Sequence, residues 1–339
     1  MNNRGVALIL SFILIAVLTV LGAASLSRSI SESRIARRYS ESTQALWLAE
    51  AGINRALNEL RDNYNITPGS GLWPTTMLED AGRYEVDVSV IDVGTKWLVT
   101  SHGCIPDVTC NSSRTQRIIE ATMTKAVSPG PANFFNNAIY TPGNVNISGS
   151  AYTVTGDVRY GGTITPDPPV NPVDNIYDTS ITTLARFDFD QLRAMSQGQG
   201  NYHDATHNPP FPTSFWKSIG VPNIVFVEGD FDLSGKKEIV GGFVIVGGDL
   251  LYDVDITGNA GVDGAIYTLG TCSVKGGGNA LFNVNGGIWA GQGVTITGST
   301  VIEYNSDYMN AIQDLNLIFT VQINNWKDTQ NSYELVPVN

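Results

Sequence analysis

The chain has 339 residues, which is long for one small domain, so we expect two or more folding units. Charged residues make up 15% of the chain and glycine occurs 35 times. This composition is typical of an exported protein rich in β-structure, and it argues against a cytosolic helical enzyme. The net charge of −12 falls on the part after residue 125. Because an acidic surface repels phosphate backbones, we expect no nucleic-acid partner.

An apolar run begins close to the N-terminus. No charged residue occurs between Val6 and Ser27, and a helix of this length reaches roughly 33 Å, enough to cross a bilayer. The run continues without a proline into a polar segment with the apolar spacing of one helix face. We therefore predict one long helix over residues 6–66, about 85 Å long, with residues 6–27 as its membrane-spanning part.

The leader MNNRG, the apolar stretch after it and the segment WLAEAGINRAL together resemble type IV prepilins, in particular minor pilins of the PilX type. The resemblance covers residues 4–60 and extends loosely to about residue 125. In that family a prepilin peptidase cuts after the glycine of the leader, here Gly5. The new terminal amine, here on Val6, is then methylated. The resemblance thus implies the prepilin peptidase and other pilin subunits as partners.

The resemblance also gives the apolar run a role. It implies that the run packs with the helices of other pilins, first in the inner membrane and later in a filament at the cell surface. Major pilins usually carry Glu as the fifth residue after the cut, where this chain has Leu10, so a minor, tip or initiating subunit is implied. A plain single-pass membrane anchor is the alternative. The packing residues that we assign are Leu8, Leu10, Phe12, Ile13, Val17 and Val20.

Residues 67–127 predict a small β-sheet. Apolar and polar residues alternate over 84–90, and two further strand-like segments follow at 97–101 and 116–124. Three short strands in sequence favour an antiparallel meander. Packed on the amphipathic half of the long helix, this meander would form a pilin-like head.

The three cysteines are Cys104, Cys110 and Cys272. Cys104 and Cys110 flank a short loop that contains a proline, and in an oxidising compartment they could form a disulfide. Two unpaired thiols are the alternative. Cys272 lies in a strand-like alternation, where we expect a small buried apolar residue.

The segment after residue 132 is repetitive. A spacing near 20 residues, with short β-branched runs and recurrent glycines, predicts a β-solenoid in which stacked coils bury a continuous column of apolar side chains. An antiparallel sandwich is the alternative. Five 11-residue segments align, starting at Ile139, Val225, Val244, Ile266 and Ile288.

We assign residues 133–306 to this solenoid-like domain, with an insertion over 166–222 that contains a short helix from Phe187. Residues 307–339 are predicted to be a capping segment. The expected fold class is therefore α+β: a long N-terminal helix on a small antiparallel meander, followed by a mainly-β solenoid.

The sequence signals for metal binding and catalysis are weak. His203 and His207 are four residues apart, a spacing that suits a metal only on a helix, and their neighbours predict a loop. An acidic group in the repeats could bind calcium but lacks the spacing of a known calcium loop. No nucleophile motif or phosphate-binding glycine loop occurs, so we expect no enzyme, metal or cofactor. The acidic group consists of Asp249, Asp253, Asp255 and Asp263.

These features favour a minor subunit of a type IV pilus or related filament, active in pilus assembly. The C-terminal domain would serve in adhesion to a surface or polysaccharide ligand. One alternative is a membrane-anchored solenoid enzyme acting on polysaccharide. Another is a pseudopilin of a type II secretion system.

Overall fold

The computed structural model describes residues 3–62, 76–78, 82–105, 110, 115–131, 133–149, 151–165, 173–178, 181–233, 238–248, 250–277 and 282–329. For residues 3–10, 76–78 and 173–178, Tyr177 excepted, only the backbone is described. The chain divides into two compact units. Unit 1 comprises Met1–Lys125 and Val321–Asn339, and unit 2 comprises Ala126–Thr320. Unit 2 is therefore an insertion in the sequence of unit 1.

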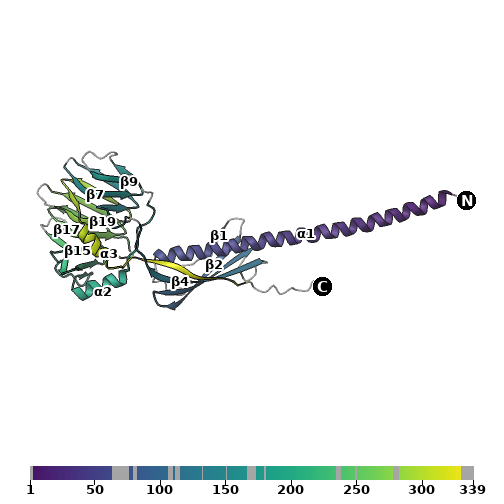
Figure 1. Ribbon diagram of the computed structural model, residues 1–339, viewed down its shortest axis with the longest axis horizontal. Helices are drawn as coiled ribbons and strands as arrows, with labels where there is room; N and C mark the ends of the chain where they lie inside the picture. The colour runs from purple at the N-terminus through teal and green to yellow at the C-terminus, as the bar shows by residue number, and fades with distance from the viewer. Residues whose placement is uncertain are drawn as a thin grey trace. The chain divides into compact units, whose positions relative to one another are not determined.

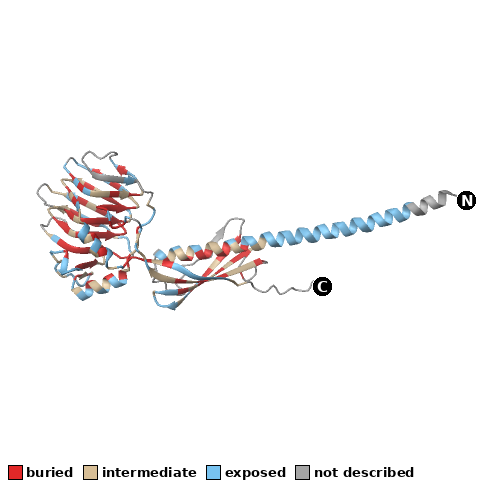
Figure 2. Ribbon diagram, viewed as in Figure 1, coloured by how far each residue is buried: buried red, intermediate tan, exposed pale blue. Residues whose placement is uncertain are grey.

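Unit 1 begins with the helix α1 (Asn3–Asp62), which confirms the long helix predicted from the sequence. No proline interrupts it. Ion pairs of i,i+4 spacing, such as Arg28–Glu32 and Arg37–Glu41, lie on its exposed surface beyond the apolar run. The part of α1 nearest its C-terminal end is amphipathic. It buries a row of alanine, leucine and isoleucine side chains (Figure 2): Ala45, Leu48, Ala49, Ile53, Ala56 and Leu60.

This buried row packs against one face of a five-stranded sheet (Figure 1). The strand order is β1-β2-β3-β4-β22, and the pairs β1–β2, β2–β3 and β3–β4 are antiparallel. The predicted meander therefore exists, with longer strands than the sequence pattern suggested. The strands are β1 (Thr76–Leu78), β2 (Gly82–Asp92), β3 (Lys96–Ile105), β4 (Thr115–Val127) and β22 (Phe319–Thr329).

The helix approaches β3 closely at one point. A Cβ atom added to Gly103 would lie 1.9 Å from the carbonyl oxygen of Ala45, so only glycine fits there. Ala45 and Ala49 are fully buried beside it. Small residues on both elements thus set the distance between helix and sheet.

The last strand of the head sheet comes from the far end of the sequence. β22 lies beside β4, although unit 2 separates the two strands along the chain. The prediction that residues 307–339 cap the solenoid is therefore wrong for β22. The short helix α3 (Ser306–Gln313) does belong to unit 2, where it contacts two solenoid strands and β12. Local patterns cannot reveal a strand whose pairing partner is so distant in sequence.

Unit 2 is a β-solenoid built from two parallel sheets, which rules out the antiparallel sandwich. The nine-stranded sheet contains β5 (Ile139–Thr141), β7 (Thr153–Tyr160), β9 (Val173–Asp178), β10 (Tyr202–His203), β13 (Ile224–Val227), β15 (Ile239–Val246), β17 (Gly261–Thr268), β19 (Val284–Ala290) and β21 (Val301–Tyr304). The six-stranded sheet contains β6 (Asn144–Ser148), β8 (Ile164–Thr165), β14 (Phe231–Asp232), β16 (Val254–Gly258), β18 (Thr271–Gly276) and β20 (Gly293–Gly298). A separate antiparallel hairpin joins β11 (Trp216–Ser218) to β12 (Val221–Pro222).

The coils do not stack in sequence order. The coil that begins at Ile139 packs on the coil that begins at Ile288, the last of the repeats, through the parallel pairs β19–β5 and β20–β6. The chain then crosses to the other end of the stack before it reaches β13. This crossing contains helix α2 (Phe189–Gln199), capped by Asp188, close to the helix predicted from Phe187. The predicted insertion starts too early, because β9 still pairs with β7.

A column of glycines runs through three neighbouring strands of the nine-stranded sheet, β15, β17 and β19. Gly242, Gly264 and Gly286 lie in register on neighbouring strands, with φ of 128°, 155° and 152°. A Cβ atom on Gly264 would lie 1.8 Å from the carbonyl oxygen of Gly242, and one on Gly286 would lie 2.1 Å from that of Gly264. The three strands therefore approach this closely only because no side chain projects from the glycine column.

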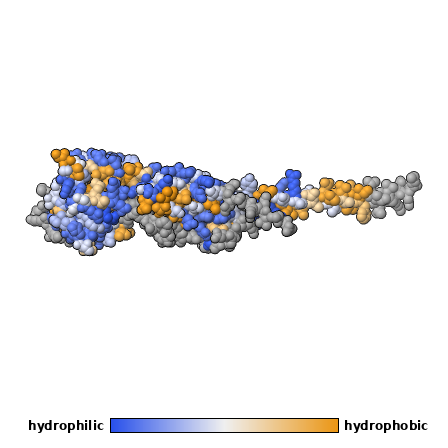
Figure 3. All heavy atoms as spheres, turned by 90° about the horizontal axis from the view of Figure 1, so that it is seen from below, coloured by the Kyte–Doolittle hydropathy of each residue, from blue (hydrophilic) through white to orange (hydrophobic). Residues whose placement is uncertain are grey.

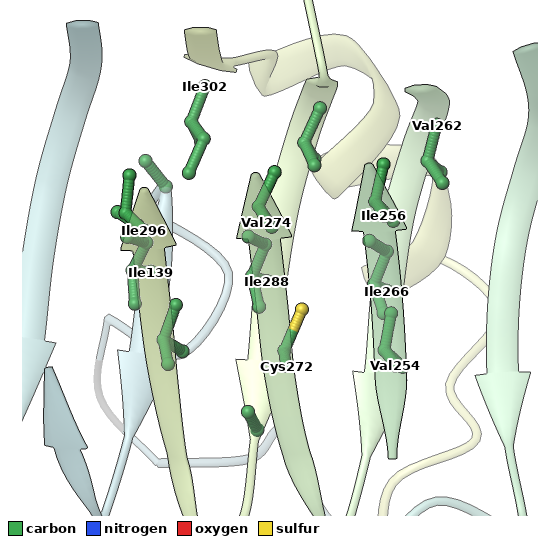
Figure 4. Close-up of a cluster of buried hydrophobic side chains, with 14 of the residues drawn as sticks. Ile139, Val254, Ile256, Val262, Ile266, Cys272, Val274, Ile288, Ile296 and Ile302 are labelled. Atoms are coloured by element: carbon green, nitrogen blue, oxygen red, sulfur yellow. The ribbon is translucent and has the colours of Figure 1, made fainter. Parts of the chain in front are cut away.

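Two apolar cores fill unit 2. The first lies inside the solenoid, where Val254 and Val274 from one sheet and Ile266 and Ile288 from the other point inward (Figure 4). The second covers the outside of the nine-stranded sheet and is rich in aromatic residues. There Phe134 stacks on Trp289 with ring centroids 5.0 Å apart. Helices α2 and α3 contribute to this second core, which fixes the crossing segment to the stack.

Candidate functional site

The most distinctive surface of unit 1 is the exposed apolar part of α1. Every described side chain from Ser11 to Ser40 is exposed (Figure 2). By length and composition this one helix is able to cross a membrane. Figure 3 shows the apolar surface of this part of the helix. Burying one large apolar side chain stabilises by about 1.5–3 kcal/mol, so a run of them favours a lipid or protein environment.

The predicted packing residues that the structure describes are exposed, and the exposed Leu14, Ile15 and Leu18 occupy the other sides of the helix. Phe12, Ile13, Val17 and Val20 are 73%, 57%, 51% and 69% exposed. A helix that is apolar on every side is typically buried, either in a membrane or among other protein segments. Gly5, Val6, Leu8 and Leu10 lie in the same helix, and their side chains are outside the described residues.

Cys104 and Cys110 form a disulfide, so the alternative of two unpaired thiols is wrong. The bond joins the end of β3 to Cys110, and both cysteines are buried. It thereby fixes the end of β3 that lies beside the helix. Cys272 is a free cysteine inside the solenoid core, and burial raises the pKa of its thiol to about 12. Its thiol is therefore neither a nucleophile nor a ready metal ligand at neutral pH.

Replacing both Cys104 and Cys110 by alanine is expected to lower the free energy of unfolding of unit 1 by about 2 kcal/mol, because the open loop gains freedom in the unfolded chain. Hydrogen exchange of peptides from β3 and β4 in the full chain measures this change. Cys272→Ala is the matched control and should leave exchange in those two strands unaltered. Unchanged exchange in the double variant would show that the bond does not stabilise the head.

The two histidines considered as metal ligands have other roles. His203 is buried, contacts Asn208 Oδ1 through its Nδ1 atom at 2.8 Å and stacks on Phe211. Burial lowers its pKa below the ordinary value. Between the histidines, the Asp204 carboxylate accepts hydrogen bonds from the backbone of Thr206 and His207. These contacts are those of an ordered turn.

The acidic residues of the repeats do not form one cluster. Asp253 Oδ1 accepts hydrogen bonds from the backbone N–H and the hydroxyl of Thr271, which fixes a corner between coils. Asp255 faces outward from the six-stranded sheet, and Asp263 lies on the other sheet, where it accepts a hydrogen bond from Asn285. Asp249 is outside the described residues. Among the described residues, no three His, Cys, Asp or Glu side chains are placed to hold a metal ion.

Two groups of residues that the structure brings together were not predicted from the sequence. The first is the close contact between Gly103 and Ala45, which leaves no local signal. The second is a set of outward-facing polar side chains on the six-stranded sheet. For these a signal existed in the strict alternation of polar and apolar residues in NVNIS, from Asn144, and GVTIT, from Gly293.

Together, fold and surface define a class: a helix-on-sheet head whose long helix begins with an exposed apolar part, and which carries an inserted, discontinuous β-solenoid. No protein-family model matches the chain, and no curated protein matches it. Among solved structures, an ice-binding protein from the Antarctic ascomycete Antarctomyces psychrotrophicus is similar at 16% identity and a TM-score of 0.23, covering 52% of this chain and 98% of its own. The competence-associated pilin ComZ from Thermus thermophilus is similar at 12% identity and a TM-score of 0.20, covering 85% of this chain and 97% of its own. At these scores neither likeness carries a functional argument.

Proposed function

We propose that this protein is a subunit of a type IV pilus or related filament, held in the inner membrane by α1 before assembly. The observation that carries the proposal is α1 itself. One unbroken helix is apolar and exposed all round in its first part and packs on an antiparallel sheet in its last part. Such a helix suits a subunit that moves from a lipid environment to a bundle of equivalent helices, because both surround it with apolar groups.

A minor position in the filament, at its tip or at initiation, is the finer part of the proposal. It is supported by Leu10, which stands where major pilins usually carry Glu. Because Leu10 has no carboxylate, α1 cannot form an ion pair with the terminal amine of a neighbouring subunit inside the filament core. The PilX-type assignment, cleavage after Gly5 and methylation of Val6 are supported by the sequence resemblance.

The proposal gives the solenoid a structural or adhesive role and no catalysis. It is supported by the contacts of Asp253 and Asp263, two of the four carboxylates considered for chemistry. Asp253 accepts hydrogen bonds from Thr271 at a corner between coils. Asp263 accepts a hydrogen bond from Asn285. Asp263 also lies beside Tyr308, and burial together with this carboxylate raises the pKa of Tyr308 to about 12. An exported solenoid with such engaged acids is suited to projecting a surface.

The test compares surface and membrane fractions of the source organism. Filaments are sheared from cells that make the tagged full chain, with and without the ATPase that drives pilus assembly. We expect the chain in the sheared fraction only when the ATPase is present, and in the membrane otherwise. A chain that stays in the membrane in both strains would contradict the proposal and favour a plain anchor. Dependence on the type II secretion ATPase instead would assign it to a pseudopilin.

A further inference from the structure

The six-stranded sheet of the solenoid presents a polar outer face. Along each of its longer strands, buried apolar residues alternate with polar ones that face away from the core. Val254, Ile256, Cys272 and Val274, for example, are all buried in the core. The outward residues between them carry hydroxyl, amide, carboxylate or ammonium groups. We call this outer side the polar face.

Strand register places these side chains in straight columns. The middle column has one member from each strand, in the order Asp232, Asp255, Ser273, Thr295, Asn146 and Thr165. A parallel column runs through Thr257, Lys275, Thr297 and Ser148. Because neighbouring strands lie about 4.8 Å apart, and alternate residues of a strand about 6.6 Å apart, the polar face is a regular grid of polar groups.

The middle column differs from the corner beside it in how its polar groups are used. At the corner, Asp253 and Asn144 both accept hydrogen bonds from a threonine of the next coil. In the middle column, Asp255, Ser273, Thr295, Asn146 and Thr165 have no side-chain hydrogen bond to another described residue. Asp255, Asn146 and Thr165 are exposed, and Ser273 and Thr295 are partly exposed. The corner residues hold the coils together, whereas these five residues of the middle column keep their hydrogen-bonding capacity for an outside partner.

Charge restricts what that partner can be. Asp230, Asp232, Asp253 and Asp255 lie together at the end of the sheet nearest β14, and Lys275 is the one cation among the described outward residues. Unit 2 as a whole carries 18 acidic and 7 basic side chains. Anionic polymers are therefore repelled, and an amine is attracted at the acidic end. The remaining positions offer neutral donors and acceptors in a repeating pattern.

We propose that the polar face binds a linear polysaccharide that carries free amino groups, lying along the middle column and across the strands. A stiff chain of repeating hydroxyl and amino groups meets a row of polar side chains spaced about 4.8 Å apart, one from each strand. Its amino groups are held at the acidic end of the row by Asp255, and its hydroxyl groups meet the neutral side chains that follow. This inference rests on the proposed adhesive role of the solenoid, and it names the ligand class and the face that binds it.

The experiment uses the full chain in detergent micelles and measures binding by calorimetry. The probes are a linear glucosamine hexamer, its fully N-acetylated form and an alginate hexamer, which carries carboxylates. The glucosamine hexamer should bind best, the acetylated hexamer more weakly and alginate not at all. Thr295→Arg places a long cation in the middle of the polar face and should weaken glucosamine binding by about tenfold or more. Asp255→Asn should weaken binding of the glucosamine hexamer and leave that of the acetylated hexamer unchanged.

Thr153→Arg is the matched control, because Thr153 is an exposed threonine on β7 of the other sheet. It should bind like the wild-type chain, and thermal unfolding should show all three variants folded. An equal loss in Thr153→Arg, binding of alginate, or no binding of any probe would overturn the proposal. A chain that binds none of the probes but still enters sheared filaments would leave the pilus proposal intact and remove only this one.

Discussion

Gly264→Ala is expected to lower the free energy of unfolding of the solenoid by about 3–5 kcal/mol, among the largest effects of any single methyl group in the chain. The added Cβ would lie 1.8 Å from the carbonyl oxygen of Gly242, and 3.1 Å from its backbone nitrogen. Both atoms belong to the next strand of the same ladder, so relief requires a shift of backbone that is paired on both sides. The pairing of β17 with β15 would be disturbed at the centre of the stack.

Urea unfolding of the full chain, followed by circular dichroism, measures this loss. Gly229→Ala is the matched control, since no atom lies within 4 Å of its added Cβ and its φ is not positive. It should change stability by no more than about 0.5 kcal/mol. Equal midpoints for the two variants would show that the glycine column tolerates side chains.

Gly5→Trp is expected to abolish processing of the leader, because the resemblance places the cut directly after Gly5 and a bulky side chain would fill the site that receives glycine. The variant chain should retain its first five residues and remain in the membrane fraction. Mass spectrometry of the N-terminal peptide measures this directly in cells that make prepilin peptidase.

Gly22→Trp serves as the control for that experiment. Gly22 lies on the same helix, further along the apolar run, and nothing lies within 4 Å of an added Cβ. The control variant should be processed normally. Normal processing of Gly5→Trp as well would contradict the assignment of the cleavage site.

Much of the solenoid could be read from the sequence, because its repeats are local. The first residues of the five aligned segments are partners in the structure, in the order Val225, Val244, Ile266, Ile288 and Ile139. Alignment of short apolar runs therefore recovered the register of the nine-stranded sheet. It succeeded because each coil presents the same apolar positions to one continuous core.

The role of the glycines was only partly predictable. At Gly143 and Gly270, the fifth residues of two repeats, an added Cβ would lie 1.9 Å and 2.2 Å from a carbonyl oxygen of a neighbouring coil, as expected of a tight corner. At Gly229, in the same repeat position, nothing lies nearby. The column through Gly264 lies outside this position and was not predicted, because its constraint comes from the strands on either side.

Long-range arrangements could not be predicted. The stacking order, with Ile139 beside Ile288, and the return of β22 to β4 both depend on contacts between segments far apart in sequence. The long helix was predictable because its signal, an uncharged run followed by a helical spacing without proline, is local. The apolar exposure all round its first part then follows directly from that run.

The most direct test of the account is the intact mass and N-terminal peptide of the wild-type chain, taken from native membranes and from sheared surface material. We predict a chain that starts at Val6 with a methylated amine, present in both fractions. A chain that starts at Met1 in both fractions would contradict the pilin account and leave an anchored solenoid.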